Sequence, residues 1–159
     1  MSNLRPGDAA PDFALPDDAG NATRLSDYEG KQVVLFFYPH ANTPGCTKEA
    51  CGFRDDYSAF KRRGIALLGI SPDTVRKQLN FKNKFGLPFP LLADQDHVVA
   101  ERFGVWGLKK MYGREFMGVK RTTFVIDERG TISRVFENVK PEGHSAEVLA
   151  ALSSDRAQG

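Results

Sequence analysis

The chain lacks the features that mark secreted, membrane-embedded or nucleic-acid-binding proteins. Its 159 residues include only two cysteines, too few for a framework of stabilising disulfides. No apolar stretch approaches the roughly 20 residues that cross a bilayer, and residues 1–6 lack the apolar core of a secretory signal. The net charge of +2 indicates no particular class of partner. We therefore expect one domain, 1–159 with a core of about 6–152, that resides in the cytoplasm and binds neither membrane nor nucleic acid.

Both cysteines lie just after a short apolar run that ends abruptly. Residues 33–38 are β-branched, aromatic or aliphatic and predict a buried strand, which Pro39 ends. After Cys46, apolar residues recur at the three- and four-residue spacing of a helix. We expect Thr43 as the N-cap and Pro44 as the first helical residue. Unpaired N–H groups and the positive end of the helix dipole favour a thiolate there, so Cys46 is a candidate nucleophile.

The remaining elements indicate the fold class. We predict an N-terminal hairpin around 17–21, strands at 65–71, 89–94, 122–127 and 131–136, and helices at 73–85, 96–103 and 145–152. This order is typical of an α/β, thioredoxin-like fold with a central mixed sheet flanked by helices. In that fold the strand after Arg121 runs antiparallel to the strand before Cys46. The guanidinium and the thiol should therefore meet at one edge of the sheet.

Two separated motifs resemble those of a known family. Pro39, Thr43 and Cys46 fill a Pro-x-x-x-Thr-x-x-Cys pattern that resembles the active-site signature of the peroxiredoxins. The fuller sequence Thr-Pro-Gly-Cys-Thr-Lys-Glu-Ala-Cys at 43–51 resembles the peroxiredoxin Q branch, also called bacterioferritin-comigratory proteins. Residues 121–127 resemble the strand that carries the family's active-site arginine. The resemblance covers about Pro6 to Leu152, and it implies a peroxidase that reduces hydrogen peroxide and organic hydroperoxides without metal, haem or flavin.

The resemblance also implies a role for each matching residue. Cys46 would attack the peroxide and become a sulfenic acid, with Arg121 and Thr43 as donors and Pro39 shaping and shielding the pocket. Glu49 matches a position that pairs with arginine, although a solvated helix residue fits the sequence equally well. Cys51 is the only other cysteine in the chain, and hence the only resolver within it. A thioredoxin-like donor would recycle the enzyme, which we expect to be a monomer.

The helix geometry adds a constraint on that disulfide. Five residues along an intact helix separate two Cα atoms by roughly 8–9 Å, whereas a disulfide needs about 7 Å or less. The helix should therefore unwind locally before Cys46 and Cys51 can join. The same geometry disfavours a permanent structural disulfide.

Other interpretations of the sequence compete with these. A thioredoxin-type oxidoreductase would carry Cys-x-x-Cys, and a zinc site built from both cysteines and two histidines lacks the usual paired spacing. A non-enzymatic holdase or interaction protein on a thioredoxin-like scaffold is the alternative from another class. We interpret His40, His97 and His144 as surface or loop residues. The basic run at 109–121 predicts a solvated loop rather than a nucleic-acid patch.

Overall fold

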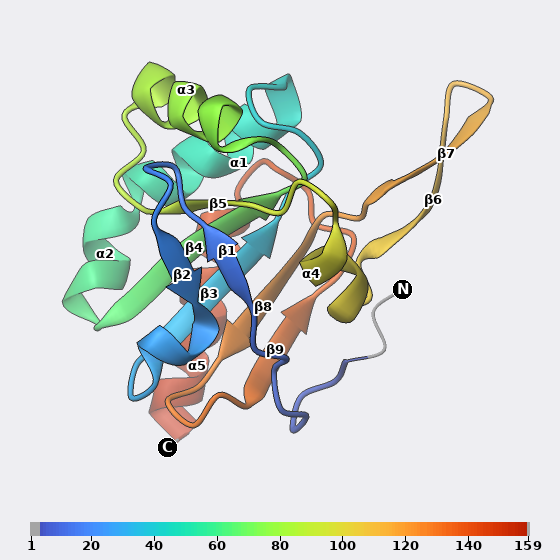
Figure 1. Cartoon of the computed structure of the whole chain (residues 1–159). Coiled ribbons are helices and arrows are strands. Elements are labelled where there is room, and N and C mark those ends of the chain that lie inside the picture. Colours follow the sequence, from blue (N-terminus) through green and yellow to red (C-terminus); the bar gives the residue numbers. More distant parts are fainter. Residues whose placement is uncertain (1–3, 159) are drawn as a thin grey trace.

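A five-stranded mixed sheet forms the centre of the molecule. The computed structural model describes residues 4–158, and side chains only as far as residue 152. The strand order is β5-β4-β3-β8-β9, in which β3, β4 and β5 are parallel and β8 and β9 run antiparallel to their neighbours (Figure 1). The strands are β3 (Gln32–Phe37), β4 (Ile65–Ser71), β5 (Leu91–Ala93), β8 (Thr122–Ile126) and β9 (Ile132–Phe136). The predicted α/β fold with a central mixed sheet is confirmed.

Helices cover both faces of this sheet because its central strand is apolar on both sides. Val33, Leu35 and Phe37 of β3 belong to one core cluster, and the alternate residues Val34 and Phe36 belong to the other. The second cluster packs against α1 (Pro44–Asp55), α2 (Tyr57–Arg62), α3 (Val75–Phe85) and α5 (His144–Gln158). The first packs against α4 (Val98–Arg102), the short 3-10 helix Leu25–Tyr28 and the N-terminal segment. The long apolar run of β3 is thus explained by burial on two faces.

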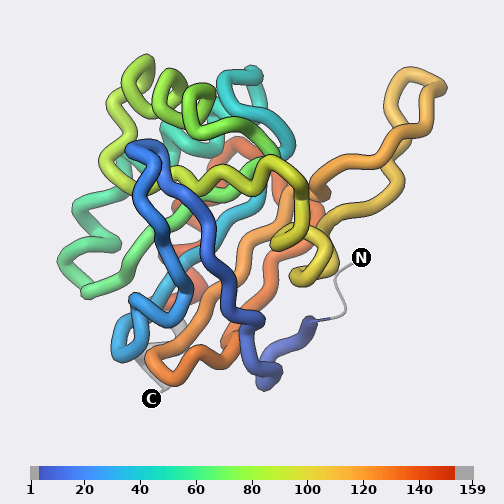
Figure 2. The backbone as a smooth tube through the Cα atoms, in the orientation of Figure 1, coloured from blue at the N-terminus to red at the C-terminus, as the bar shows by residue number. Residues whose placement is uncertain are grey.

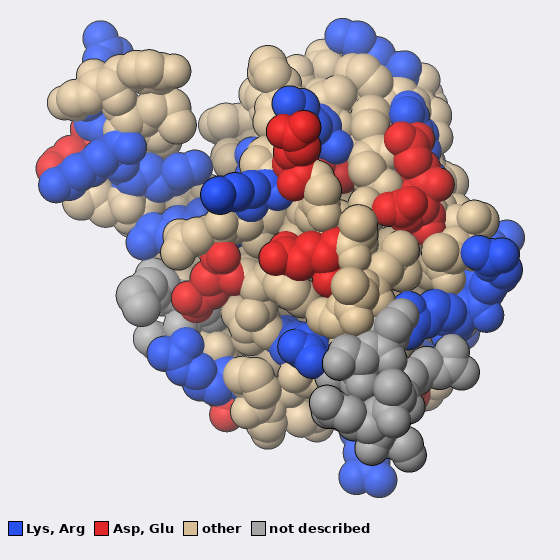
Figure 3. All heavy atoms as spheres, turned by 180° about the vertical axis from the view of Figure 1, so that it is seen from behind, with Lys and Arg blue, Asp and Glu red and all other residues tan. Residues whose placement is uncertain are grey.

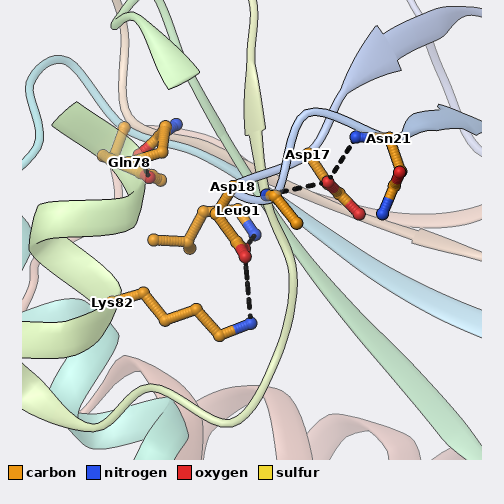
Figure 4. A network of polar contacts seen from close by, with 8 residues as sticks. Asp17, Asp18, Asn21, Gln78, Lys82 and Leu91 are labelled. Carbon is orange, nitrogen blue, oxygen red and sulfur yellow. Dashed lines mark hydrogen bonds and ion pairs between the residues drawn. The ribbon is translucent and has the colours of Figure 1, made fainter. Parts of the chain in front are cut away.

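The expected N-terminal hairpin is present as β1 (Ala14–Pro16) and β2 (Ala22–Arg24). A carboxylate at its turn fastens it to the sheet and to α3. Asp18 accepts a hydrogen bond from the backbone N–H of Leu91 at 2.9 Å and faces the ammonium of Lys82 at 3.3 Å (Figure 4). The neighbouring Asp17 accepts from backbone N–H groups within the turn itself, including that of Asn21 at 2.9 Å. The turn therefore covers the edge strand β5.

One expectation for the fold is wrong. Residues 109–121 do not form a solvated loop, since most of them belong to a β-hairpin of β6 (Trp106–Met111) and β7 (Arg114–Val119). Figures 1 and 2 show this hairpin projecting from the body of the molecule as a separate arm. Its two turn residues, Tyr112 and Gly113, both have positive φ, 53° and 75°. A two-residue turn of this kind matches the twist of the flanking strands, but Asn or Asp usually stands where Tyr112 does.

Candidate active site

The first turn of α1 places Cys46 beside the carboxyl end of β3. Thr43 is the N-cap, with extended backbone angles of −90° and 157°, and Pro44 is the first helical residue, as the sequence predicts. The side chain of Thr43 does not cap the helix, since its hydroxyl donates to the carbonyl of His40 at 2.9 Å. The N–H groups of the first turn are therefore not taken up by that hydroxyl. Cys46 itself is 1% exposed.

Arg121 reaches Cys46 because β8 runs antiparallel to β3. In the register of these strands Thr122 lies opposite Phe37, so Arg121 stands just beyond the end of β3, where α1 begins. Its Nη2 donates to the Sγ of Cys46 at 3.5 Å. The predicted meeting of guanidinium and thiol at one sheet edge is confirmed, across 75 residues of sequence.

The same guanidinium joins a buried carboxylate on the next turn of α1. Nη1 of Arg121 donates to Oε1 of Glu49 at 2.7 Å, and the Glu49 side chain is fully buried. For Glu49 the sequence is equally compatible with an arginine ion pair and with a solvated helix residue. The structure shows the ion pair. A Cβ atom at Gly45 would lie 3.1 Å from Nη2, so glycine at that position leaves the guanidinium room to lie against the helix.

Burial of this cluster alters the titration of two of its members. Desolvation raises the pKa of Glu49 to about 7, although the Arg121 charge acts in the opposite direction. Burial alone would lower the pKa of Arg121, but the charges of Cys46 and Glu49 outweigh burial and raise that pKa above its ordinary value. Because the pKa of Arg121 is raised, its guanidinium stays charged beside the thiol. The second oxygen of Glu49, Oε2, has no hydrogen-bond partner within the described part of the chain.

A buried polar network, which the sequence did not reveal, holds the loop before α1. The carboxylate of Asp73 accepts from the backbone N–H of Ala41 at 2.7 Å and from the hydroxyl of Ser71 at 2.6 Å. Gln78 donates to that hydroxyl at 2.8 Å and accepts from the hydroxyl of Tyr38 at 2.5 Å. The loop also contains Asn42 in a left-handed conformation with φ of 65°. These contacts fix the path from β3 through the half-buried Pro39 to the helix.

Cys51 lies further along the same unbroken helix. It is partly exposed, whereas Cys46 is buried, and both thiols are free. Since α1 is wound from Pro44 to Asp55, the Cα atoms of the two cysteines are roughly 8–9 Å apart by helix geometry. This separation exceeds what a disulfide spans. The structure therefore holds the cysteines in a reduced arrangement.

The surface or loop interpretation of His144 is wrong. Its side chain is 1% exposed at the start of α5, where Nε2 lies 2.8 Å from the hydroxyl of Thr123 and Nδ1 lies 2.8 Å from Glu147. Its ring packs edge-on against Phe53 of α1 and Phe136 of β9. Burial lowers its pKa, opposed by the hydrogen bond to Glu147. The sequence could not reveal this burial, because the packing partners come from distant segments.

The other two histidines agree better with expectation. His40 is exposed beside the active-site loop. His97 is partly exposed and stacks on Trp106, with ring centroids 3.8 Å apart. Trp106 in turn packs against the core cluster that contains Phe103 and Val105.

Among the described side chains, no three or more His, Cys, Asp or Glu residues are grouped so that they could hold a metal ion. None of the described helices combines the length and apolar character needed to cross a membrane.

Comparison with known proteins agrees with this geometry. Residues 6–135 match the model of the AhpC/TSA family. Peroxiredoxin Bcp of Bacillus subtilis is 48% identical over 146 residues, which cover 92% of this chain and 93% of the relative. Peroxiredoxin Bcp of Escherichia coli is 46% identical over 149 residues, covering 94% and 96% of the two chains.

Solved structures give the same result. A cysteine-to-serine variant of PrxQ from Xylella fastidiosa superposes with a TM-score of 0.92 at 32% identity, covering 98% of this chain and 99% of the other. Peroxidoxin BcpB from Mycobacterium tuberculosis superposes with a TM-score of 0.85 at 43% identity, covering 96% and 98%. The comparisons favour the peroxidase over the non-enzymatic binding protein that the sequence alone left open. The chain therefore belongs to the AhpC/TSA family, and within it to the Bcp and peroxiredoxin Q branch of thiol peroxidases.

Proposed function

We propose that Cys46 is the peroxidatic cysteine of this enzyme, acting on hydrogen peroxide and organic hydroperoxides. The observation that carries the proposal is the Arg121 guanidinium, which contacts the thiol of Cys46 and the carboxylate of Glu49 together. A fixed positive charge at this place can stabilise the negative charge that moves from the sulfur to the leaving oxygen during the attack. Glu49 holds the planar group in orientation, and is therefore a positioning residue rather than a catalytic one.

The chemistry follows from these contacts. The thiolate of Cys46 attacks one peroxide oxygen, so that an S–O bond forms while the O–O bond breaks. The departing alkoxide or hydroxide takes a proton and leaves as alcohol or water. Arg121 and the free N–H groups at the start of α1 stabilise the charge that develops on the leaving oxygen. Thr43 can add a donor once its hydroxyl turns from the His40 carbonyl, and Pro39 shields the pocket from water.

We propose that Cys51 resolves the resulting sulfenic acid. Its thiolate attacks the Cys46 sulfur, so that an S–S bond forms while the S–O bond breaks. The departing hydroxide takes up the proton that the Cys51 thiol gave up and leaves as water. The intact helix keeps the two residues too far apart, so the helix must unwind over at least part of Pro44–Asp55. A thioredoxin-type dithiol then reduces the disulfide and is itself oxidised. We further propose that the enzyme works as a monomeric single domain in the reducing cytoplasm, where both free thiols are maintained.

The test is peroxide consumption coupled to NADPH through thioredoxin reductase and thioredoxin, with dithiothreitol as a parallel reductant. The wild-type enzyme should turn over with both reductants, and Cys46→Ser with neither. Turnover by Cys46→Ser would contradict the assignment of the peroxidatic cysteine. If the wild type turned over with dithiothreitol but not with thioredoxin, that result would contradict thioredoxin as the physiological type of donor.

A further inference from the structure

The β6–β7 hairpin, here called the arm, gathers most of the exposed apolar side chains. Seven large hydrophobic residues with described side chains are exposed, and five of them lie on the arm. The five are Leu108, Met111, Tyr112, Phe116 and Met117, and Tyr112 at the tip is 96% exposed. Scattered single apolar residues are normal on a protein surface, but a cluster of this kind indicates an interaction site.

The body of the protein supports only the base of the arm. There Val119 is buried, the N–H of Lys120 donates to the carbonyl of Val105 at 2.7 Å, and Trp106 stacks on His97. Beyond the base the two strands form a two-stranded sheet of their own, clear of the main sheet (Figure 2). Six paired residues give the arm a length of roughly 20 Å. Such a ribbon offers an accessible surface to a partner.

The arm and its connection to β8 are strongly basic. Residues 109–121 contain five basic residues and one acidic residue, and Figure 3 shows Lys and Arg atoms along the projecting arm. The single acid, Glu115, pairs with Lys110 at 3.4 Å. Two such arms would repel each other, which disfavours self-association through this surface. The charge instead complements a partner with an acidic face.

The arm is continuous with the active site. Its second strand, β7, ends at Val119, two residues before Arg121, and Lys109 donates to the Val119 carbonyl at 3.0 Å. A cleft of about 370 Å³ at the base of the arm is lined in part by Leu108, Lys109 and Arg121. Burial and the Arg121 charge lower the pKa of Lys109, while the nearby charge of Cys46 acts in the opposite direction. A protein bound to the arm would therefore lie against the edge of the sheet where Cys46 reacts.

We propose that the arm is the docking surface for the protein dithiol that reduces the oxidised enzyme, a thioredoxin-type protein with an acidic, partly apolar face around its thiols. This inference rests on the proposed function, because that cycle requires a protein dithiol to approach the active-site edge at every turnover. The bound partner's thiolate attacks one sulfur of the Cys46–Cys51 disulfide, and its second thiol releases the mixed disulfide. The partner leaves oxidised and both cysteines of this chain leave reduced.

The test compares a protein reductant with a small one. Tyr112→Asn removes the exposed ring, and asparagine before glycine suits a turn with positive φ, so the arm should fold at least as well. Arg114→Glu reverses one charge of the arm. The matched control is Lys61→Glu, which makes the same change of charge on an exposed residue of α2, far from the arm in Figure 1. Steady-state rates are measured with thioredoxin, thioredoxin reductase and NADPH, and separately with dithiothreitol.

We expect the double variant Tyr112→Asn/Arg114→Glu to lower kcat/KM for thioredoxin by about tenfold, the loss typical of truncating one anchoring aromatic contact. The dithiothreitol rate should stay within about twofold of the wild type, and Lys61→Glu should change neither rate by more than that. Raising the ionic strength should weaken thioredoxin use by the wild type more than by the double variant.

Several outcomes would overturn the inference. One is an unchanged kcat/KM for thioredoxin in the double variant, and another is an equal loss with dithiothreitol. A wild-type enzyme that turns over with dithiothreitol but not with thioredoxin would also overturn it. So would a wild-type dimer that Tyr112→Asn dissociates in sedimentation. A wild type inactive with both reductants would instead contradict the proposed function itself.

Discussion

The two cysteines stand about 1.4 turns apart on α1, yet different forces hold their parts of the helix. The turn that carries Cys46 is held by charge, through the single guanidinium of Arg121 that contacts the thiol and Glu49. The part after Cys51 is held by packing. There Phe53 stacks on Phe36 with ring centroids 4.6 Å apart, and Gly52 allows Ser145 of α5 to approach closely.

This difference suggests where unwinding begins. In the proposed reaction the Cys46 thiolate becomes a neutral sulfenic acid. This step would remove a charge that Arg121 contacts, but it would leave the aromatic packing around Phe53 unchanged. The first turn also contains Gly45, which has low helix propensity. We therefore expect the turn at Cys46 to unwind and move toward Cys51, while the later part of α1 stays in place.

The largest expected effect comes from Cys46→Ser. A serine hydroxyl is not ionised near neutral pH, so this variant should show no measurable peroxide consumption with any reductant. Serine is close in size to cysteine, so the circular dichroism spectrum should match that of the wild type. Substantial turnover would mean that the charged end of α1 is not where the chemistry occurs.

Cys51→Ser should separate the first oxidation, at Cys46, from the resolution step that Cys51 performs. This variant should consume one equivalent of peroxide at nearly the wild-type rate and then stop at the sulfenic acid. Without a resolving thiol it should overoxidise to sulfinate more readily. Mass spectrometry of the intact protein after stoichiometric peroxide measures both products. Equal loss of the first oxidation in Cys51→Ser and Cys46→Ser would show that the division of roles is wrong.

Arg121→Lys keeps the charge but loses the planar fork that contacts sulfur and carboxylate together. We expect the second-order rate with peroxide to fall by about one to three orders of magnitude, as for removal of one transition-state donor. Stopped-flow measurement of the single oxidation isolates this step from recycling. A wild-type rate would make the arginine purely structural.

Glu49→Gln tests how much the buried carboxylate of Glu49 lowers the free energy of unfolding, and how that effect depends on pH. Burial raises the pKa of Glu49 from its ordinary value of 4.5 to about 7 in the folded protein. The folded state therefore holds this proton more tightly than the unfolded chain does. The wild type should therefore lose stability relative to Glu49→Gln as the pH rises from about 4.5 to 7, by about 3 kcal/mol at most, and no further above that. Urea unfolding of both proteins at pH 5, 6, 7 and 8 measures the difference. A constant difference would show that Arg121 keeps the carboxylate ionised throughout.

The main elements of this site could be predicted from the sequence because their signals are local or topological. The apolar run of β3 and the Thr43-Pro44 helix start place Cys46 in the first turn of α1, and the strand order places Arg121 opposite. The sequence does not predict the arm, because Tyr112 stands where asparagine is usual in such a turn. Several of its apolar side chains are exposed, so the hydrophobic pattern of this run does not predict buried strands. The burial of His144 and the contact between Asp73 and Ala41 depend on distant segments, which no local pattern reports.

The most direct test of the account is amide hydrogen exchange across α1 in the reduced protein and after one equivalent of peroxide, together with peptide mapping of the disulfide. We predict one intramolecular Cys46–Cys51 disulfide in the oxidised protein. Exchange should be much faster in residues 44–51 after oxidation, with a smaller change around Phe53. A disulfide between two chains would contradict the account, as would an oxidised protein in which the helix stays protected from Cys46 through Cys51.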